Sequence, residues 1–421
     1  MNKLKLLNLK KINFFYFLIY LFPISFILGT GVLNINSFLI AIFAVYYIFN
    51  DKNFFIKYKS FFIFFFIFFF LILLNCIFSY DAYASSLFGA NILKFFFTSV
   101  GLLFFFEDKE ENIEKFSLFL IFLSLFVCVD TFIQYFLGKD IFGYEINYSH
   151  GNRLSGPFNN EYVVGSFLSK IVFLSLIKLD SIQKKYYLFF FLIFVDLTIL
   201  ISNERAATIM MLISTFLFFY FSKIYYLKEK IFIILLIFTI IISVFKFNNK
   251  IREHFIKNTL NQFQISKFED LKDNKFFDSQ WGAHYLTAIE IFKDNPIFGT
   301  GLKTFRKVCG DPKYENINSK SYKTRCSTHP HNFYLEFLSE GGIFLFSYFL
   351  IVNLLICYNF LKLLFMKKYS GINHSLLIFL VYFILFNPIQ TTGSIFSSWN
   401  GGFYWLAISF IIYQFRLMSP K

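Results

Sequence analysis

The sequence predicts an all-α protein that crosses a membrane about twelve times and carries one large polar segment outside the membrane. Hydrophobic residues make up 57% of the 421 residues, whereas charged residues make up only 16%. Long runs of Phe, Ile and Leu recur along the chain at the length that spans a bilayer core. Lys and Arg gather in every second connection between these runs. Together these observations exclude a soluble globular domain.

The apolar runs define the expected spans in chain order. Several are close to the shortest run that crosses a bilayer core, so eleven spans are compatible with the same pattern. The twelve expected spans are Ile12–Leu28, Val32–Phe49, Phe61–Phe78, Leu87–Phe106, Phe116–Leu137, Tyr162–Leu179, Tyr186–Ile201, Ala206–Phe221, Ile231–Phe247, Ile343–Phe365, Leu376–Ile389 and Phe403–Phe415.

The distribution of Lys and Arg predicts how the spans are oriented. With a cytoplasmic N-terminus, the inward connections carry 20 Lys and Arg residues, and the short outward loops carry only Lys139, Arg153 and Arg205. Both termini are therefore expected to be cytoplasmic. The same asymmetry accounts for most of the net charge of +14. The charge consequently points to membrane lipids as surroundings and not to a nucleic-acid partner.

The largest outward region is residues 248–340, an insert within a single membrane domain expected over residues 1–421. Ile251–Ile265 has the amphipathic spacing of a helix that lies on a membrane surface. Ala283–Phe292 is expected to be a helix that ends at Asn295-Pro296. A turn over Gly299–Gly301 follows, and a single Gly-x-Gly is too short a motif to indicate phosphate binding.

Two histidines two residues apart close this polar region. Pro330 lies between His329 and His331 and disfavours a helix at His329. After Asn332 the apolar spacing becomes helical, so His331 is expected near a helix N-terminus at the mouth of the next span. A polar loop that merely caps the helix would look the same. The expected membrane surface and the outward arginines favour a functional histidine.

The two outward arginines each lie beside a span. Arginines near span ends commonly extend to lipid headgroups, and Arg205 also has Glu204 and Asp196 near enough in sequence to pair with it. The alternative is that the guanidinium groups of Arg153 and Arg205 bind phosphate oxygens through two parallel hydrogen bonds each. Both interpretations remain open from the sequence.

Four ionisable residues fall inside expected spans, where charge is costly. A structural role, in which the acids neutralise the lysines or Arg205, is favoured for them. They are Lys94, Asp130, Lys170 and Asp196.

Cys309 and Cys326 are the two cysteines of the polar region, and they form a candidate disulfide if that region faces an oxidising compartment. The other three cysteines lie in or beside apolar runs and are expected to pack there. His329 and His331 could share one metal ion, but no acidic or cysteine cluster with matching spacing accompanies them. No metal and no cofactor is therefore predicted.

Four short motifs, in order along the chain, resemble those of the O-antigen ligase and polymerase family. The similarity covers most of the chain from about Arg153 onward, and it does not separate ligases from polymerases. The motifs are Arg153-x-Ser155-Gly156, Ser202-x-x-Arg205-Ala206, Asn295-Pro296-x-x-Gly299-x-Gly301, and His331-Asn332-x-x-Leu335 followed by Glu340-Gly341-Gly342.

The resemblance implies a fold and an activity. The fold would be that of an all-helical membrane glycosyltransferase of the GT-C kind, in the bacterial inner membrane. The donor would be a glycan on undecaprenyl diphosphate at the periplasmic leaflet, and the acceptor would be lipid A–core or another glycan. His331 would be catalytic, Arg205 would bind the diphosphate, and His329 would position the loop. Such an enzyme would transfer the glycan with inversion and without a metal.

One departure from the family pattern concerns the diphosphate. The family often has a second arginine about fifteen residues before the proline of the Pro-x-x-Gly-x-Gly turn. Here that place holds Gln280-Trp281, with His284 one helical turn later. Either His284 or Arg153 takes its place, or the donor is held differently.

Competing functions are a polymerase that joins lipid-linked repeat units, a lipid-linked glycan transporter, and a scaffold whose loop binds a partner. The polymerase would share the chemistry of the ligase. A transporter would have its sites at mid-membrane with repeat symmetry, and the sequence has no recognisable repeat.

Overall fold

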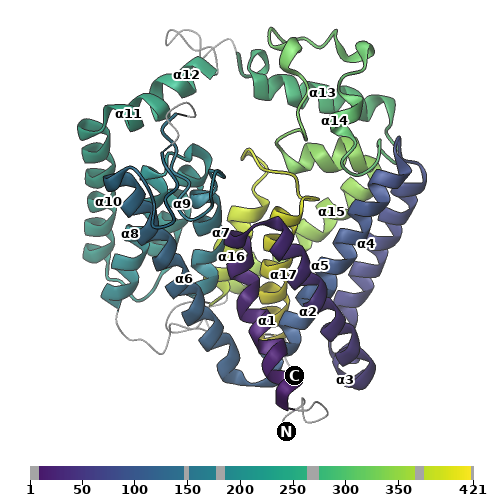
Figure 1. Cartoon of the computed structure of the whole chain (residues 1–421), viewed down its shortest axis with the longest axis horizontal. Helices are drawn as coiled ribbons and strands as arrows, with labels where there is room; N and C mark the ends of the chain where they lie inside the picture. The colour runs from purple at the N-terminus through teal and green to yellow at the C-terminus, as the bar shows by residue number, and fades with distance from the viewer. Residues whose placement is uncertain (1–8, 147–150, 177–184, 263–274, 366–373, 419–421) are drawn as a thin grey trace.

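The computed structural model describes residues 9–146, 151–176, 185–262, 275–365 and 374–418. Within these ranges the regular structure is helical, apart from one isolated bridge between Lys139 and Glu145. Long helices run side by side between two ends of the molecule (Figure 1). We call the end at which α1 begins and α17 ends the lower end, and the opposite end the upper end.

Each expected apolar run overlaps a helix. Leu179, the expected end of one run, lies outside the described residues, and the helix of the run Leu376–Ile389 ends at Phe386. Among the described residues, six helices are long and apolar enough to cross a membrane, judged by length and composition, and several shorter apolar helices accompany them. The chain is therefore a multi-pass membrane protein. The apolar helices, long and short, are α1 (Leu9–Leu28), α2 (Thr30–Asn50), α4 (Lys59–Ile77), α5 (Ala82–Asp108), α6 (Glu110–Leu137), α7 (Val164–Ser175), α8 (Lys185–Ile201), α9 (Arg205–Phe221), α10 (Leu227–Phe247), α15 (Phe333–Phe365), α16 (His374–Phe386) and α17 (Ser398–Met418).

Local sequence sets several helix boundaries. The Asp81 carboxylate accepts a hydrogen bond from the backbone of Ala84 at 2.9 Å, which caps the first turn of α5. Gly138 ends α6 in the left-handed conformation, at φ 80°. Asp51 likewise caps the short helix α3 (Lys52–Lys57) that joins α2 to α4. Polar cap residues thus turn the chain between apolar runs.

Phenylalanine rings fill much of the interior. Phe65 and Phe96 stack with ring centroids 3.5 Å apart, and Phe54 stacks on Phe104 at 3.7 Å. Flat side chains with few rotatable bonds can pack helices closely at small entropic cost. By contrast, only 6% of the residues in the most apolar stretch of α10 are buried. The side chains of this helix are therefore exposed to lipid.

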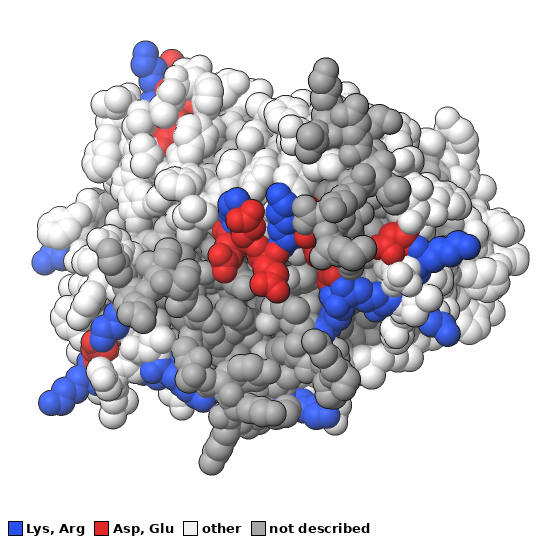
Figure 2. Space-filling model, turned by 90° about the horizontal axis from the view of Figure 1, so that it is seen from below, with Lys and Arg blue, Asp and Glu red and all other residues white. Residues whose placement is uncertain are grey.

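The lower end carries mixed charge (Figure 2). Glu107, at the end of α5, forms ion pairs with Lys57 and Arg416 and accepts a hydrogen bond from the Tyr58 hydroxyl at 2.7 Å. The segment Glu107–Lys115, which includes the end of α5 and the start of α6, is net acidic. Glu107 therefore serves as a link between α3, α5 and α17.

The upper end carries the short helices of residues 249–332 (Figure 1). Residues 263–265 of the expected surface helix lie outside the described residues, and the remainder is helical up to Gln262. The short helices are α11 (Asn249–Arg252), a π-helical turn (Glu253–Lys257), α12 (Asn258–Gln262), α13 (Gln280–Asp294) and α14 (Phe305–Val308).

The ionisable residues inside the apolar helices do not neutralise one another, and that expectation is wrong for the described chain. Their hydrogen-bond partners are uncharged groups on their own or neighbouring segments, which satisfy a buried polar atom without a second buried charge. The partners are Asn34 and Asn91 for Lys94, Asn400 for Lys170, the Ile141 backbone N–H for Asp130, and Thr215 for Asp196.

Candidate functional site

The helix α15 begins where its sequence pattern predicts. The Asn332 side chain accepts hydrogen bonds from the backbone of Tyr334 at 3.0 Å and Leu335 at 3.2 Å, and so caps the helix. His331, directly before the cap, has a left-handed backbone with φ 59°. A non-glycine residue in this region costs free energy and persists only where its surroundings hold it. The His331 backbone oxygen accepts a hydrogen bond from the N–H of Thr392 at 2.8 Å, which is one such restraint.

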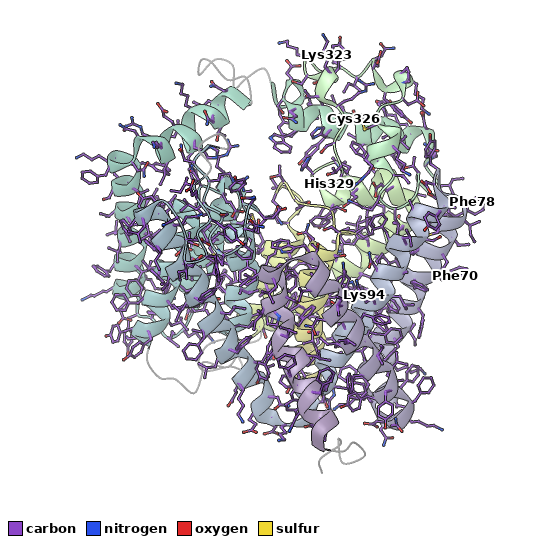
Figure 3. The ribbon with its side chains drawn as sticks, viewed as in Figure 1. Phe70, Phe78, Lys94, Lys323, Cys326 and His329 are labelled. Carbon is purple, nitrogen blue, oxygen red and sulfur yellow. A yellow bond between two sulfur atoms is a disulfide. The ribbon has the colours of Figure 1, made fainter. Side chains whose placement is uncertain are left out.

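Four aromatic side chains surround this point, and we call Trp281, His284, His329 and His331 the histidine group. The His331 ring centroid lies 4.2 Å from that of His329, 4.7 Å from that of Trp281 and 5.2 Å from that of His284. Trp281 and His284 come from one face of α13, three residues apart. His329 lies near the middle of the molecule below Cys326 in Figure 3. The structure therefore brings three of the candidate site residues together.

Hydrogen bonds assign the proton on His329. Its Nε2 lies 3.0 Å from the carbonyl oxygen of Thr392, which only accepts, so Nε2 carries the proton. Its Nδ1 then accepts from the Thr328 hydroxyl at 2.8 Å. Both ring nitrogens of His329 are engaged in holding the loop.

The ring of His331 has a different partner. Its Nε2 lies 2.9 Å from the Ser327 hydroxyl, which can either donate or accept. The pKa of His331 is lowered to about 3, mainly by burial and then by the nearby His329, His284 and Lys303 in that order of effect. The pKa of His329 is lowered to about 4, again mainly by burial. Both rings are consequently neutral near pH 7.

Lys303 is a residue that sequence reasoning missed. Its side chain is buried, its backbone is left-handed with φ 61°, and its charge lowers the pKa of both His329 and His331. Arg306, which is exposed, also lowers the pKa of His329. These are the cations that affect the histidine group. The Gly-x-Gly turn that ends two residues before Lys303 was the available signal in the sequence.

Two buried carboxylates connect this region to α15. Glu340 accepts hydrogen bonds from the backbone N–H of Lys303 at 2.7 Å and of Phe305 at 2.9 Å. Glu336 accepts from the backbone of Ile395 at 3.0 Å and from the Ser394 hydroxyl. Both carboxylates are fully buried. Their role in tying two turns to α15 depends on the tertiary structure.

The turn over Gly299–Gly301 packs against the Glu340–Gly342 segment. A Cβ on Gly299, where φ is 68°, would lie 2.4 Å from the backbone oxygen of Glu340. A Cβ on Gly342, also at φ 68°, would lie 2.4 Å from the oxygen of Ile297. The two glycines of separate motifs thus permit one close backbone contact.

A disulfide joins Cys309 to Cys326, with their Cα atoms 5.3 Å apart. The backbone oxygen of Cys309 also accepts a hydrogen bond from Nε of Arg325 at 3.1 Å. Ser327, the partner of His331, follows Cys326 directly. The covalent link therefore connects α14 to the loop that carries the histidines.

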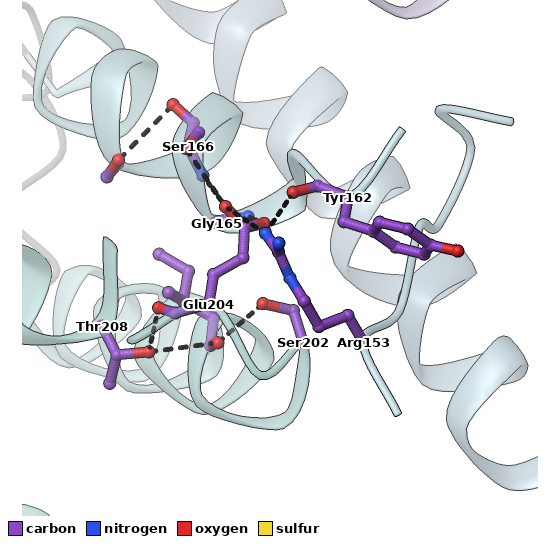
Figure 4. Close-up of polar contacts among 9 residues, drawn as sticks. Arg153, Tyr162, Gly165, Ser166, Ser202, Glu204 and Thr208 are labelled. Carbon is purple, nitrogen blue, oxygen red and sulfur yellow. Dashed lines mark hydrogen bonds and ion pairs between the residues drawn. The ribbon is translucent and has the colours of Figure 1, made fainter. Parts of the chain in front are cut away.

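The two arginines lie elsewhere, on the loop before α7 and at the start of α9. Nη2 of Arg153 donates to the backbone oxygen of Tyr162 at 2.6 Å and lies 3.8 Å from the Glu204 carboxylate (Figure 4). Glu204 also accepts from the backbone of Gly165 at 2.5 Å and of Ser166 at 3.2 Å, and so caps α7. The suggested Glu204–Arg205 pair is wrong, because the carboxylate turns toward α7 and Arg153.

Arg205 points to the surface segment that follows α10. Its Nη1 donates to the Thr259 hydroxyl at 2.7 Å. His254 belongs to the same segment, and both arginines affect its pKa. The pKa is lowered to about 4, mainly by burial and then by the charges of Arg205 and Arg153. We call Arg153, Arg205 and His254 the arginine group.

The structure separates the two groups. Among the described residues, the contacts of the His331 side chain are with Trp281, His284, His329 and Ser327, and neither arginine is among them. α9 lies on one side of the upper end and α13 on the other (Figure 1). His284 belongs to the histidine group, and Arg153 lies with the other arginine. Among the described residues, no set of three or more His, Cys, Asp or Glu side chains is placed to hold a metal.

These features define a polytopic helical membrane protein with a polar site of neutral histidines at one end. Residues 188–350 match the model of the O-antigen ligase family, so this part of the chain carries that family's domain. The match extends from α8 into α15 and includes the whole histidine group, Lys303, Arg205 and His254, whereas Arg153 precedes it. No curated protein matches the chain. The family consists of membrane-bound, glycosyltransferase-like enzymes of the ligase and polymerase kind.

Proposed function

We propose that the protein is an O-antigen ligase-like glycosyltransferase. It moves a glycan from undecaprenyl diphosphate to lipid A–core or another acceptor at the periplasmic face of the inner membrane. The observation that carries this proposal is the neutral His331, held before α15 within the residues that match the family. A neutral imidazole has the lone pair that a general base needs.

In this mechanism His331 takes the proton of an acceptor hydroxyl as its oxygen attacks the anomeric carbon of the donor. One carbon–oxygen bond forms, and the bond from the anomeric carbon to the diphosphate breaks, with its electron pair leaving on the diphosphate. Direct displacement inverts the anomeric centre and forms no glycosyl-enzyme. If the Ser327 hydroxyl accepts from Nε2–H of His331, Nδ1 holds the reactive lone pair. His329 positions the loop, because both of its nitrogens are engaged.

Fixed cations stabilise the leaving group in place of a metal. Arg205 is the first candidate for the diphosphate and Arg153 the second, since a guanidinium can donate two parallel hydrogen bonds to phosphate oxygens. Lys303 is the cation whose charge affects His331. Because the anomeric carbon is bonded directly to the diphosphate, the histidine and arginine groups must reach the same donor molecule. His284 contacts His331 and is a candidate for holding the sugar.

The test uses purified full-length protein with a lipid-linked donor and an acceptor. Loss of a general base costs roughly a hundredfold to ten-thousandfold in rate, so His331→Ala should lose transfer by that factor. His329→Ala is the matched control and should lose less, and EDTA should leave the wild-type rate unchanged. Full activity in His331→Ala would end the mechanism. A loss with EDTA that a divalent cation restores would replace it with a metal-assisted one.

A further inference from the structure

The arginine group is assembled from three separate stretches of chain. The ring of His254 packs against Gly151, where an added Cβ would lie 2.8 Å from Nδ1. The backbone oxygen of Gly151 accepts a hydrogen bond from the Asn203 side chain at 2.7 Å. Gly151 precedes Arg153 by two residues, and Asn203 precedes Arg205 by two. His254 therefore lies where the two arginine-bearing turns meet.

A widened helical turn presents this histidine. Glu253–Lys257 is π-helical, and the backbone N–H of Asn258 bonds to the oxygen of Glu253. In such a turn, residues five apart lie one above the other, and π-helical turns occur frequently at functional sites. His254 and Thr259 have this spacing, and Thr259 accepts the hydrogen bond from Arg205. The surface segment thus contacts Arg205 through Thr259, and it places His254 within reach of the charges of both arginines.

The charges around His254 suit an anion. Arg205 and Arg153 lower the pKa of His254, and Glu204, an acid beside Arg153, also accepts a hydrogen bond at the start of α7. The ring is therefore neutral beside two cations. A bound anion with two charges would offset those cations and favour protonation of the ring, which would then donate a charge-assisted hydrogen bond.

We propose that His254 is a further ligand of the lipid-linked diphosphate and completes, with Arg153 and Arg205, a three-membered anion site. The inference rests on the proposed function for the identity of the anion. The shared chemistry is a phosphate group on a lipid, which could belong either to the donor or to an anionic headgroup of the bilayer. Both phosphates of a glycan-linked diphosphate carry fixed charges near neutral pH, so any proton taken up on binding must come to the protein.

The experiment measures binding and not transfer. Full-length protein is placed in nanodiscs of neutral lipid and titrated with a polyprenyl diphosphate sugar between pH 5.5 and 8, in two buffers of different ionisation enthalpy. Wild type should bind more tightly as pH falls and should take up about one proton. A hydrogen bond to a charged group contributes about 1.5–3 kcal/mol. His254→Gln should thus weaken binding at pH 5.5 by about tenfold to a hundredfold and abolish the proton uptake.

Controls separate the possible failures. Lys257→Gln changes an exposed residue of the same turn and should keep the pH dependence, and melting temperatures show whether each variant is folded. If His254→Gln binds like wild type while Arg205→Ala does not, the inference fails and the proposed function stands. If neither variant affects binding, the proposed diphosphate site itself fails. If His254-dependent binding appears only with phosphatidylglycerol nanodiscs, the site recognises headgroups and the donor assignment is overturned.

Discussion

The Ser327 hydroxyl lies 2.9 Å from Nε2 of His331, one residue after the disulfide-bonded Cys326. The backbone of His331 is held in a left-handed conformation, and the hydrogen bond to Ser327 holds the far end of its side chain. Together these two restraints fix the orientation of the imidazole ring. The reactive nitrogen of the proposed base is therefore set by a residue that the family motifs do not include.

Ser327→Ala should lower the rate of transfer by about twofold to tenfold, since a neutral hydrogen bond contributes about 0.5–1.5 kcal/mol. Ser327→Thr keeps the hydroxyl and should restore most of the rate. The measurement is kcat against KM for both variants. An effect confined to KM would show that Ser327 holds substrate and does not position His331.

The pH dependence of stability follows from the lowered pKa values of the histidines. His329 and His331 have folded-state pKa values of about 4 and about 3, below the ordinary value of 6.5. Between pH 6.5 and 4 the unfolded chain therefore binds more protons than the folded chain, and stability falls as pH falls through this window. Melting temperatures at pH 7.5 and pH 5 measure this effect. The His329→Gln/His331→Gln double variant should show a smaller drop, and an equal drop would assign the effect to other groups.

Removal of the disulfide should destabilise the upper end. Closing a loop of 17 residues contributes about 3 kcal/mol in the entropic model, so Cys309→Ser should lower the melting temperature and, through Ser327, the activity. When membranes are treated with an alkylating reagent, neither cysteine should react until reductant is added. Two thiols that react without reductant would contradict the bond.

Gly138 and Gly299 both have a left-handed backbone, so alanine variants at these two positions can be compared directly. A Cβ on Gly138 would meet nothing within 4 Å, whereas one on Gly299 would lie 2.4 Å from the Glu340 backbone. Gly138→Ala should cost about 1 kcal/mol for the backbone conformation alone. Gly299→Ala should cost more and should also reduce transfer, because it displaces the turn that leads to Lys303. Equal thermal stability of the two variants would show that the contact is not needed.

The orientation in the membrane remains a prediction of the positive-inside rule. Reporter fusions at Lys57, at the lower end, should show cytoplasmic activity, and fusions at Lys313, within residues 248–340, should show periplasmic activity. Cytoplasmic activity from the Lys313 fusion would place the histidine group on the wrong side for a periplasmic donor.

Local patterns in the sequence were sufficient for much of the fold. Apolar runs of span length predict the helices, because a backbone in lipid must satisfy its own hydrogen bonds within the helix. The start of α15 after Asn332 and the helix α13 before Asn295-Pro296 were also predicted, since they depend on residues a few positions apart. The match to the O-antigen ligase family agrees with the resemblance of four short motifs.

Only the tertiary structure decided which side chains meet. His284 packs on His331 across 47 residues of sequence, His254 packs against Gly151 on the loop of Arg153, and Glu204 turns to α7 instead of Arg205. Periodicity and composition describe the neighbours of a residue along its own helix. They do not determine how helices pack, and contacts between distant segments, including the burial that keeps the histidines neutral, arise from that packing.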